Sequence, residues 1–421
     1  MRVLLLGGGG REHAIGWKLA QSDLMAELIS VPGNPGLAEV GAVVPGIDIM
    51  DPDAVLGLAV ANAVDLVVIG PEAPLAVGVV DALVEAGIAA YGPHAAGARL
   101  EASKAYAKDV MRRAGVPTGD AHTFRSLDPA VAFLESIDGP YVVKADGLAA
   151  GKGVLVTEDR IAAEAWVRFC LEGHFGEAGS TVVVEEHLDG QEVSVLALCD
   201  GERALVLEPA RDYKRLLDGG IGPNTGGMGC YSPVTDLPTG LVDFVLREVM
   251  EPTLATLQED GVSYRGFLFA GMMLTADGPK VLEFNCRLGD PETQVILPRL
   301  DEDLLELLAA ATDGDLPDRP LRFKDLAAVD VVLAATGYPE NPVRGAAITG
   351  VDPVQERDDV HVFHAGTRHT AAGVHSDGGR VLNVVGTGPD IATARAAAYE
   401  AAEAITFHGK QYRTDIAGGA Q

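Results

Sequence analysis

The spacing of the apolar runs constrains the fold more than any other feature of the sequence, and this spacing changes near residue 103. Before that point, the runs at Val3–Leu6, Leu28–Val31 and Asp65–Ile69 predict strands, and the patterns at Glu12–Ala20 and Ala76–Ala86 predict helices. Such alternation is typical of a parallel sheet with helices on both faces. We therefore expect the N-terminal part of the chain to form an α/β domain.

Beyond residue 103 the predicted strands lie much closer together. A helix at Lys104–Ala114 is followed by strands at Tyr141–Ala145 and Val154–Thr157, and the glycine-rich segment between these strands is too short for a crossover helix. A connection of that length requires an antiparallel pair. The centre is therefore predicted to be an α+β region, with further strand pairs formed by Thr181–Glu185 with Glu192–Leu198 and by Phe267–Leu274 with Lys280–Arg287.

The C-terminal part is separated from the centre by a predicted linker. Asp313–Pro320 contains three Asp, two Pro and one Gly, a composition typical of connecting segments. After it, Ala327–Ala335 and Arg380–Gly386 predict strands, and the alanine-rich Ile391–Ile405 predicts a helix. A chain of 421 residues fits two to four domains of roughly 100–200 residues each.

Charge and cysteine content exclude several classes of protein. There are 61 acidic and 32 basic side chains, so the formal net charge of -29 disfavours binding to nucleic acid or anionic membranes. The four cysteines are far apart and predict reduced core residues rather than a zinc site. We see no signal peptide and no run of about 20 apolar residues, and we expect a cytoplasmic protein.

A first glycine loop, Gly7–Gly10, follows the first predicted strand and leads into Arg11, Glu12 and His13. Glycine amides at a helix N-terminus can bind a phosphate. A dinucleotide site would need an acidic residue after the second strand, where the sequence has Pro32-Gly33-Asn34. We therefore favour a monophosphate site assisted by Arg11; the alternative is a tight turn for close helix–strand packing.

A second glycine loop contains Gly151, Lys152 and Gly153 and joins two predicted antiparallel strands. It lacks the Ser or Thr that follows the lysine of a P-loop, and it does not open a helix. Its backbone amides can still cover a triphosphate, with Lys144 on the preceding strand directed at the phosphates. The alternative is a flexible surface loop.

The stretch Val281–Arg287 predicts a strand of period two and carries the most specific chemistry. Glu283, Asn285 and Arg287 share one face, with Leu282, Phe284 and Cys286 on the other. A carboxylate and an amide oxygen about 7 Å apart suit Mg²⁺ beside ATP phosphates. Arg287 can bind a carboxylate or phosphate as a fork. The alternative, a solvated polar face, is disfavoured because Asn is uncommon within strands.

Two further stretches are weaker signals. Glu185, Glu186, Leu188 and Glu192 could form a nucleotide hinge, although charged strand ends are usually solvated. The basic cluster Arg211–Arg215, next to the glycine-rich Gly219–Gly229, is a candidate anion site or a mobile loop.

Taken together, these motifs resemble the phosphoribosylamine–glycine ligases (glycinamide ribonucleotide synthetases) of the ATP-grasp superfamily. Cys286–Gln294 is the most specific match, while Tyr213 and Leu288 stand where His and Phe are more usual. The matching stretches follow one another along nearly the whole chain: Gly7–His13, Gly70–Leu75, Lys144–Val154, Gly222–Gly229, Glu283–Gln294, Ala335–Pro339 and Gly379–Val385.

The resemblance implies three domains and a reaction. It implies an N-terminal parallel-sheet domain at 1–102, an ATP-grasp domain with antiparallel sheets at 103–315, whose lid spans about 121–190, and a small C-terminal α/β domain at 316–421. ATP, glycine and 5-phosphoribosylamine would give glycinamide ribonucleotide, ADP and phosphate in purine synthesis. The enzyme would be a monomer or a weak homo-oligomer.

The resemblance also implies roles for individual residues. Arg287, Lys144 and Asp212 would be catalytic, and Glu283 and Asn285 would hold Mg²⁺ or Mn²⁺. ATP would contact Lys104, Lys144, Gly151, Lys152, Gly153, Glu185, Glu186, Leu188 and Glu192. The other substrates would contact Gly8, Gly9, Gly10, Arg11, Pro71, Glu72, Lys214, Arg215, Asn224, Gly226, Arg287 and Asp290.

Three alternatives remain at this point. One is another ATP-grasp ligase or carboxylase, which should lack the Gly222–Gly229 loop joined to Cys286–Glu292. A second is a nicotinamide oxidoreductase, disfavoured by the missing acid after the second strand. The third is a non-catalytic nucleotide sensor, disfavoured by the intact lysines and metal ligands.

Overall fold

The computed structural model describes residues 1–148 and 153–420. Its N-terminal part is a five-stranded sheet in the order β3-β2-β1-β4-β5, and every neighbouring pair is parallel. This confirms the prediction made from the alternating pattern. The strands are β1 (Arg2–Gly7), β2 (Glu27–Pro32), β3 (Ala42–Val43), β4 (Leu66–Ile69) and β5 (Ala89–Tyr91).

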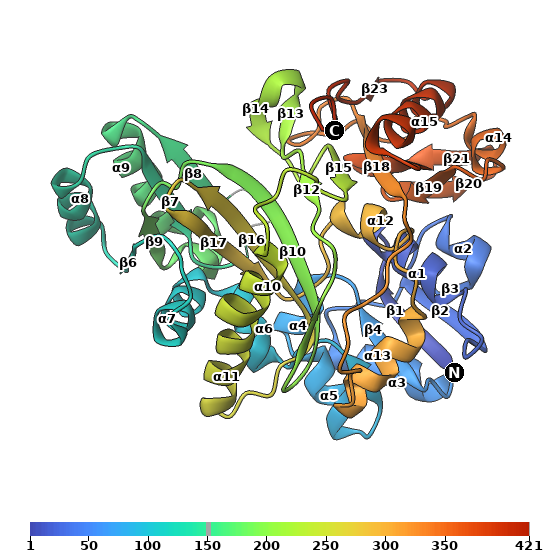
Figure 1. Cartoon of the computed structure of the whole chain (residues 1–421), viewed down its shortest axis with the longest axis horizontal. Helices are drawn as coiled ribbons and strands as arrows, with labels where there is room; N and C mark the ends of the chain where they lie inside the picture. The colour runs from blue at the N-terminus through green and yellow to red at the C-terminus, as the bar shows by residue number, and fades with distance from the viewer. Residues whose placement is uncertain (149–152, 421) are drawn as a thin grey trace.

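Six helices accompany this sheet (Figure 1). The helix predicted at 76–86 is present as α5, but it begins only at Val79, and Glu72–Ala76 forms a separate helix, α4. Gly78, with φ of +85°, lies between them in the left-handed region, which interrupts helical hydrogen bonding. The helices are α1 (Gly10–Leu19), α2 (Leu37–Val40), α3 (Pro52–Ala61), α4 (Glu72–Ala76), α5 (Val79–Glu85) and α6 (Ala95–Ala102).

The central sheet is antiparallel and has the order β11-β10-β16-β17. Its hairpin β16–β17 turns at Thr275–Gly278, as predicted. Its strands are β10 (Gln191–Asp200), β11 (Ala204–Val206), β16 (Arg265–Thr275) and β17 (Gly278–Asn285), and the nearby helices are α7 (Lys104–Ala114), α10 (Leu241–Val245), α11 (Glu251–Glu259), α12 (Glu292–Ile296) and α13 (Leu304–Asp313).

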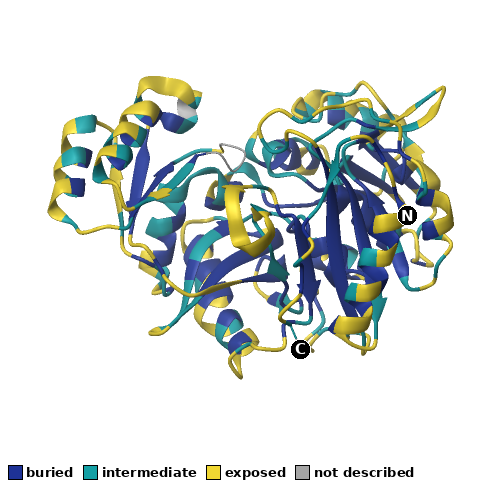
Figure 2. Cartoon of the chain, turned by 90° about the horizontal axis from the view of Figure 1, so that it is seen from above, coloured by how far each residue is buried: buried dark blue, intermediate teal, exposed yellow. Residues whose placement is uncertain are grey.

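A second antiparallel sheet, β6-β9-β7-β8, projects from the molecule with two helices on it and has a small apolar core of its own (Figures 1 and 2). The predicted pairing of the strands near 183 and 195 is wrong. The chain passes from this sheet to the central one through residues 186–190, so β9 pairs with β6 and β7 and not with β10. The elements are β6 (Ala121–Phe124), α8 (Leu127–Ser136), β7 (Tyr141–Ala145), β8 (Val154–Thr157), α9 (Arg160–Phe169) and β9 (Val182–Glu185).

The C-terminal sheet combines strands from two parts of the chain. Its order is β12-β15-β18-β22-β19, with β23 beside β18, so β12 and β15 come from before the predicted linker. Helix α15 packs on β18 and β22. The elements are β12 (Arg211–Asp212), β15 (Gly229–Ser232), β18 (Ala327–Ala335), α14 (Val351–Gln355), β19 (Val360–His364), β22 (Arg380–Gly388), α15 (Ile391–Ala404) and β23 (Lys410–Gln411), with separate hairpins β13–β14 (Arg215–Leu217, Ile221–Asn224) and β20–β21 (Thr367–Thr370, Gly373–Ser376).

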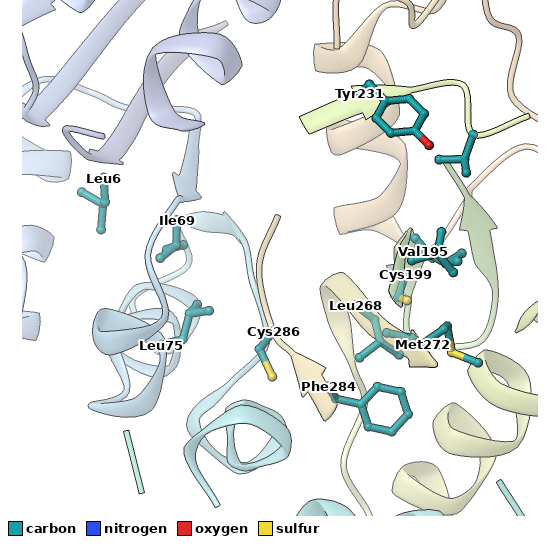
Figure 3. Close-up of a cluster of buried hydrophobic side chains, with 14 of the residues drawn as sticks. Leu6, Ile69, Leu75, Val195, Cys199, Tyr231, Leu268, Met272, Phe284 and Cys286 are labelled. Atoms are coloured by element: carbon teal, nitrogen blue, oxygen red, sulfur yellow. The ribbon is translucent and has the colours of Figure 1, made fainter. Parts of the chain in front are cut away.

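The largest apolar cluster runs through the N-terminal domain, the central sheet and the C-terminal sheet. Figure 3 shows it from Leu6 and Leu75 of the N-terminal domain to Val195 and Met272 of the central sheet, with Cys286 between the two groups. Such continuity holds the domains together at the place where β17 ends. Within the described residues, no helix is long and apolar enough to cross a membrane.

Candidate functional site

The polar face of β17 forms the middle of the candidate site. Glu283 and Asn285 pair with Gly271 and Phe269 of β16, so their side chains share one face, as predicted. The prediction that Arg287 continues this strand face is wrong, because β17 ends at Asn285. A bulge in the register beside Met272 alters the alternation before them. Val281, rather than the predicted Leu282, therefore joins Phe284 and Cys286 in the core.

Two lysines from different elements approach this face. Ser103 caps α7 by accepting a hydrogen bond from the Tyr106 amide, and Asp146, just after β7, accepts a second one from the Ala105 amide at 2.7 Å. These contacts fix the first turn of α7, and hence Lys104, next to the end of the strand that carries Lys144. The Lys104 ammonium donates to the Gly147 carbonyl at 3.2 Å.

The lysines keep the Glu283 carboxylate ionised. Burial alone would raise the pKa of Glu283, but Lys214, Lys144 and Lys104 lower it below its usual value. None of the described residues donates a hydrogen bond to this carboxylate. A charged carboxylate without a hydrogen-bond partner can ligate a divalent cation. The ammonium groups around it can bind the phosphates that accompany such a cation.

The carboxylate of Glu185 is held by two lysines. Lys144 lies 2.9 Å and Lys108 lies 3.0 Å from the same Glu185 oxygen, Oε2. All three side chains are buried or nearly so. Sequence reasoning missed Lys108, although its position four residues after Lys104 places both on one face of α7.

Arg287 links the central sheet to the N-terminal domain. Its Nη2 lies 3.0 Å from Glu101, at the end of α6, and donates to Asn285 Oδ1 at 3.2 Å, while its Nε lies 3.4 Å from Glu72. Burial opposes ionisation of Glu72, but Arg287 and Arg11 lower its pKa. Burial raises the pKa of Glu101. Glu101 was missed because a carboxylate at a helix end is normally solvated.

The first glycine loop is packed closely against all three domains. A Cβ on Gly10 would lie 2.1 Å from Asn383 Nδ2, and one on Gly8 would lie 2.5 Å from the Gly33 carbonyl. Arg11 donates to Glu12 at 2.6 Å and to the Leu288 carbonyl at 3.1 Å. Close packing therefore accounts for part of the glycine pattern, and the phosphate role stays a prediction.

Asp290 lies beside this loop and joins it to the C-terminal sheet. Its carboxylate accepts from Gln294 at 2.6 Å and from Arg380 at 2.8 Å. Arg380 also donates to the Asp290 and Gly226 carbonyls, at 2.6 and 2.5 Å. Arg380 was missed by sequence reasoning, although it lies within one of the stretches that carried the resemblance.

Lys214 makes an ion pair with Glu192. Asp212 lies close to Lys214. Burial, and then the nearby Glu292, raise the pKa of Asp212 well above its usual value. The Asp212 Oδ1 atom is buried and has no hydrogen-bond partner within the part of the chain that the structure describes. Asp212 and Lys214 thus join the polar face of β17, since Lys214 also influences Glu283.

The remaining predicted residues differ in position and in exposure. Leu188 is buried and Pro71 precedes α4, both near the site elements, whereas Glu186 pairs with Lys280 at the surface. Arg215 and Asn224 lie on the exposed β13–β14 hairpin, and Gly226 is exposed as well. The Gly153 carbonyl accepts from the Ala145 amide at 2.8 Å. Gly151 and Lys152 lie outside the described residues.

His13, which follows the first glycine loop, has a structural environment. Its Nδ1 accepts from the His364 amide at 2.8 Å, and its ring meets Phe363 edge-on. Burial, followed by His364, lowers its pKa to about 3. A neutral, buried imidazole at this position joins α1 to β19.

The comparisons with known proteins agree with the geometry. Family models described as the phosphoribosylglycinamide synthetase N domain, ATP-grasp (A) domain and C domain match residues 1–101, 102–293 and 328–419. The chain belongs to the phosphoribosylglycinamide synthetase family. Among relatives, the phosphoribosylamine–glycine ligase of Streptomyces coelicolor is 49% identical, and the match covers 100% of this chain and 99% of the relative. That of Caulobacter vibrioides is 47% identical over 99% and 97%.

Solved structures extend the similarity to three dimensions. The phosphoribosylamine–glycine ligase of Thermotoga maritima is 37% identical and superposes with a TM-score of 0.86, covering 99% of this chain and 100% of that one. A biotin carboxylase domain from Hydrogenobacter thermophilus, at 16% identity and a TM-score of 0.72 over 97% and 91%, shares the fold. The phosphoribosylglycinamide synthetase family thus uses a multidomain α/β fold with an ATP-grasp core, as predicted.

A magnesium ion fits the residues of this family member. Within the described part of the chain, no group of three or more His, Cys, Asp or Glu side chains could hold a metal. Mg²⁺, however, usually takes only one or two protein carboxylates and completes its shell with water and substrate phosphates. The unpartnered Glu283 carboxylate, with the Asn285 amide oxygen on the same face, provides ligands of that kind.

Proposed function

We propose that this chain catalyses the ATP-dependent ligation of glycine to 5-phosphoribosylamine through a glycyl phosphate, giving glycinamide ribonucleotide, ADP and phosphate. The observation that carries the proposal is the polar face of β17, where Glu283 and Asn285 lie among lysines from α7, from β7 and from the segment between β12 and β13. Membership in the phosphoribosylglycinamide synthetase family supports the choice of substrates.

The chemistry requires activation of a poor electrophile. Glycine carboxylate resists attack by an amine until ATP's γ-phosphate converts it to an acyl phosphate. Phosphoryl transfer depends on positioning and charge neutralisation more than on covalent help from the protein. Lys104 and Lys144 would neutralise the α- and β-phosphates, in an acidic protein that otherwise repels anions.

Glu283 and Asn285 would hold Mg²⁺, or Mn²⁺ in its place. A bound divalent cation would neutralise phosphate charge during transfer. The Glu283 pKa, held low by the lysines, keeps the carboxylate ready to bind a cation at neutral pH. Glu185, Leu188 and Glu192 would frame adenosine, with Leu188 acting through its backbone.

At the substrate end, Gly8–Arg11 would receive the ribose phosphate. Glu72 lies beside them, within the influence of Arg11 and Arg287. Arg287 would orient a carboxylate or the acyl phosphate; among the described residues its buried Nε makes an ion pair with Glu72 at 3.4 Å but no hydrogen bond. Asp212, Lys214 and Asp290 would complete the substrate walls. The roles of Arg215, Asn224 and Gly226 require the β13–β14 hairpin to face the same ligand.

The wider setting is also part of the proposal. We infer domain limits at 1–102, 103–315 and 316–421, with a lid at about 121–190, although β12 and β15 of the second unit hydrogen-bond with the sheet of the third. The acidic surface and four free, buried cysteines favour a cytoplasmic monomer or weak homo-oligomer.

One assay tests the proposed function. ADP release from MgATP is measured with glycine, with other amino acids and with bicarbonate, each with and without 5-phosphoribosylamine. We expect rapid release only with glycine and the amine together. Release driven by bicarbonate would instead indicate a carboxylase, and release with no acid dependence would reject the ligase reaction.

A further inference from the structure

Glu185 is shared between two lysines in a way that the sequence did not reveal. The ammonium groups of Lys144 and Lys108 both contact the single oxygen Oε2, at 2.9 and 3.0 Å. The Glu185 and Lys144 side chains are 5% and 9% exposed, and Lys108 is 10% exposed. Two ammonium groups thus contact one buried carboxylate, although a single one would balance its charge.

Lys108 is held in place independently of this pair. Its ammonium also donates to the Thr118 hydroxyl at 2.8 Å, and that hydroxyl donates to the Val281 carbonyl on β17 at 2.6 Å. Thr118 and Val281 are further joined by a backbone bridge. Lys108 therefore has fixed contacts on both sides, whereas the Lys144 ammonium contacts only Glu185 among the described residues.

This difference matters when an anion enters the site. A phosphate near Lys144 competes with Glu185 for its ammonium. If Glu185 had only Lys144, the exchange would leave a buried carboxylate unpaired, and breaking a buried ion pair is strongly unfavourable. With Lys108 in contact, Glu185 keeps a counter-ion and Lys144 can change partner at low cost.

We propose that Lys108 is a positioning residue of the nucleotide site: it retains Glu185 when Lys144 turns to the phosphates. The inference rests on the proposed function, because it takes Lys144 to be a phosphate ligand. Lys108 itself need not touch the nucleotide. Its contribution is to make Lys144 available.

The first test replaces Lys108 with Met, which keeps the length of the side chain and removes its charge. We expect the dissociation constant for MgADP, measured by calorimetry, to rise roughly tenfold or more, while that for adenosine, which has no phosphates, stays within about twofold. The KM for ATP should rise more than the KM for glycine. The matched control is Arg112→Met, an exposed site on the same helix, which should bind MgADP like the parent.

A double substitution separates positioning from a general structural role. If Lys108 acts through Glu185, then Lys108→Met should weaken MgADP binding little further in a Glu185→Gln background, where Lys144 is already released. Multiplied effects in the double variant, or equal losses for ADP and adenosine, would overturn the inference. Lys108→Arg should restore most of the affinity, and failure to do so would also count against it.

Two outcomes keep the test decisive. If Lys108→Met does not fold, Lys108→Gln, which keeps a donor for Thr118 without the charge, takes its place. If the parent binds MgADP and ligates glycine but Lys108→Met is unchanged, only this inference fails. If the parent itself shows no glycine-dependent ADP release, the proposed function fails first.

Discussion

Glu283 is the residue on which the proposed metal site depends most directly. Its carboxylate is ionised because Lys214, Lys144 and Lys104 outweigh the effect of burial on its pKa. We predict that Glu283→Gln, which keeps the shape and removes the charge, lowers glycine-dependent ADP release roughly 100-fold or more. The measurement is a coupled ADP assay over a range of Mg²⁺ concentrations, with a thermal melt to verify the fold.

The matched control for this variant is Asp277→Asn, in the exposed turn of the same hairpin. It removes one negative charge close in sequence but far from the lysines, and it should retain parental activity. Full turnover by Glu283→Gln would remove Glu283 from the metal site and leave Asn285 without a charged partner there.

At the same scale, residues with a local pattern could be predicted and residues with distant partners could not. The shared face of Glu283 and Asn285 follows from the period of a strand, and the structure has it. Lys108 and Glu101 look like solvated charges on helices, because nothing in the sequence shows that Glu185 or Arg287 will lie against them. The bulge that places Val281 in the core, where Leu282 was predicted, also depends on the neighbouring strand.

At the scale of elements, strand and helix locations were largely predictable and their pairings less so. The hairpin β16–β17 and the pair β7–β8 were predicted because a short connection permits only an antiparallel partner. The pairing of β9 with β10 was wrong because the same short connection can also lead from one sheet to another. The place of β12 and β15 in the C-terminal sheet depends on the pairing of β15 with β18, about a hundred residues further along the chain, and has no local signal.

The C-terminal segment around Arg413 and Asp415, called the clip below, holds the β13–β14 hairpin in place. Buried Arg413 donates to the Arg215 carbonyl at 3.0 Å, lies over the Tyr213 ring and pairs with Asp415, which accepts from the Gly219 amide at 2.8 Å. We predict that Arg413→Ala lowers the free energy of unfolding by about 2 kcal/mol and speeds tryptic cleavage after Arg215. Limited proteolysis followed by mass spectrometry measures the cleavage.

The control for the clip is Arg368→Ala, on the exposed strand β20, which should leave both stability and cleavage at Arg215 unchanged. If Arg413→Ala unfolds more easily but its hairpin is cut no faster, the segment stabilises the domain without holding the hairpin.

At the scale of the whole molecule, the candidate site lies where three domains meet, so its geometry depends on the seams between them. Helix α12 contacts α1 of the N-terminal domain and also β15 and β18 of the C-terminal sheet. Asn34 donates to the Gly8 carbonyl at 3.0 Å and to the His364 carbonyl at 2.7 Å, which ties the glycine loop to β19. A weaker seam should therefore disturb the glycine loop before it disturbs the lysine cluster.

The seam between α1 and β19 contains three histidines, of which His13 and His364 are buried and His361 is half-buried. Burial is the main cause that lowers the pKa of His13 to about 3 and those of His361 and His364 to about 4. Each is neutral in the folded chain but takes up a proton near pH 6.5 when unfolded, so the unfolded state binds more protons below that pH. The stabilising effect of the neutral rings is therefore complete above about pH 6.5 and is lost as the pH falls toward 4.

We predict that lowering the pH from 7.0 to 5.5 reduces the free energy of unfolding by about 1 kcal/mol for each of these histidines. His13→Asn, whose side-chain oxygen can still accept from the His364 amide, should lose about 1 kcal/mol less than the parent over that interval. Denaturant unfolding at the two pH values measures the difference, and His408→Asn, at an exposed position, is the control. Because the comparison is between slopes, any constant cost of the smaller side chain cancels. An identical slope in parent and His13→Asn would mean that this seam stays closed when the rest of the chain unfolds, or that His13 is protonated in the folded protein.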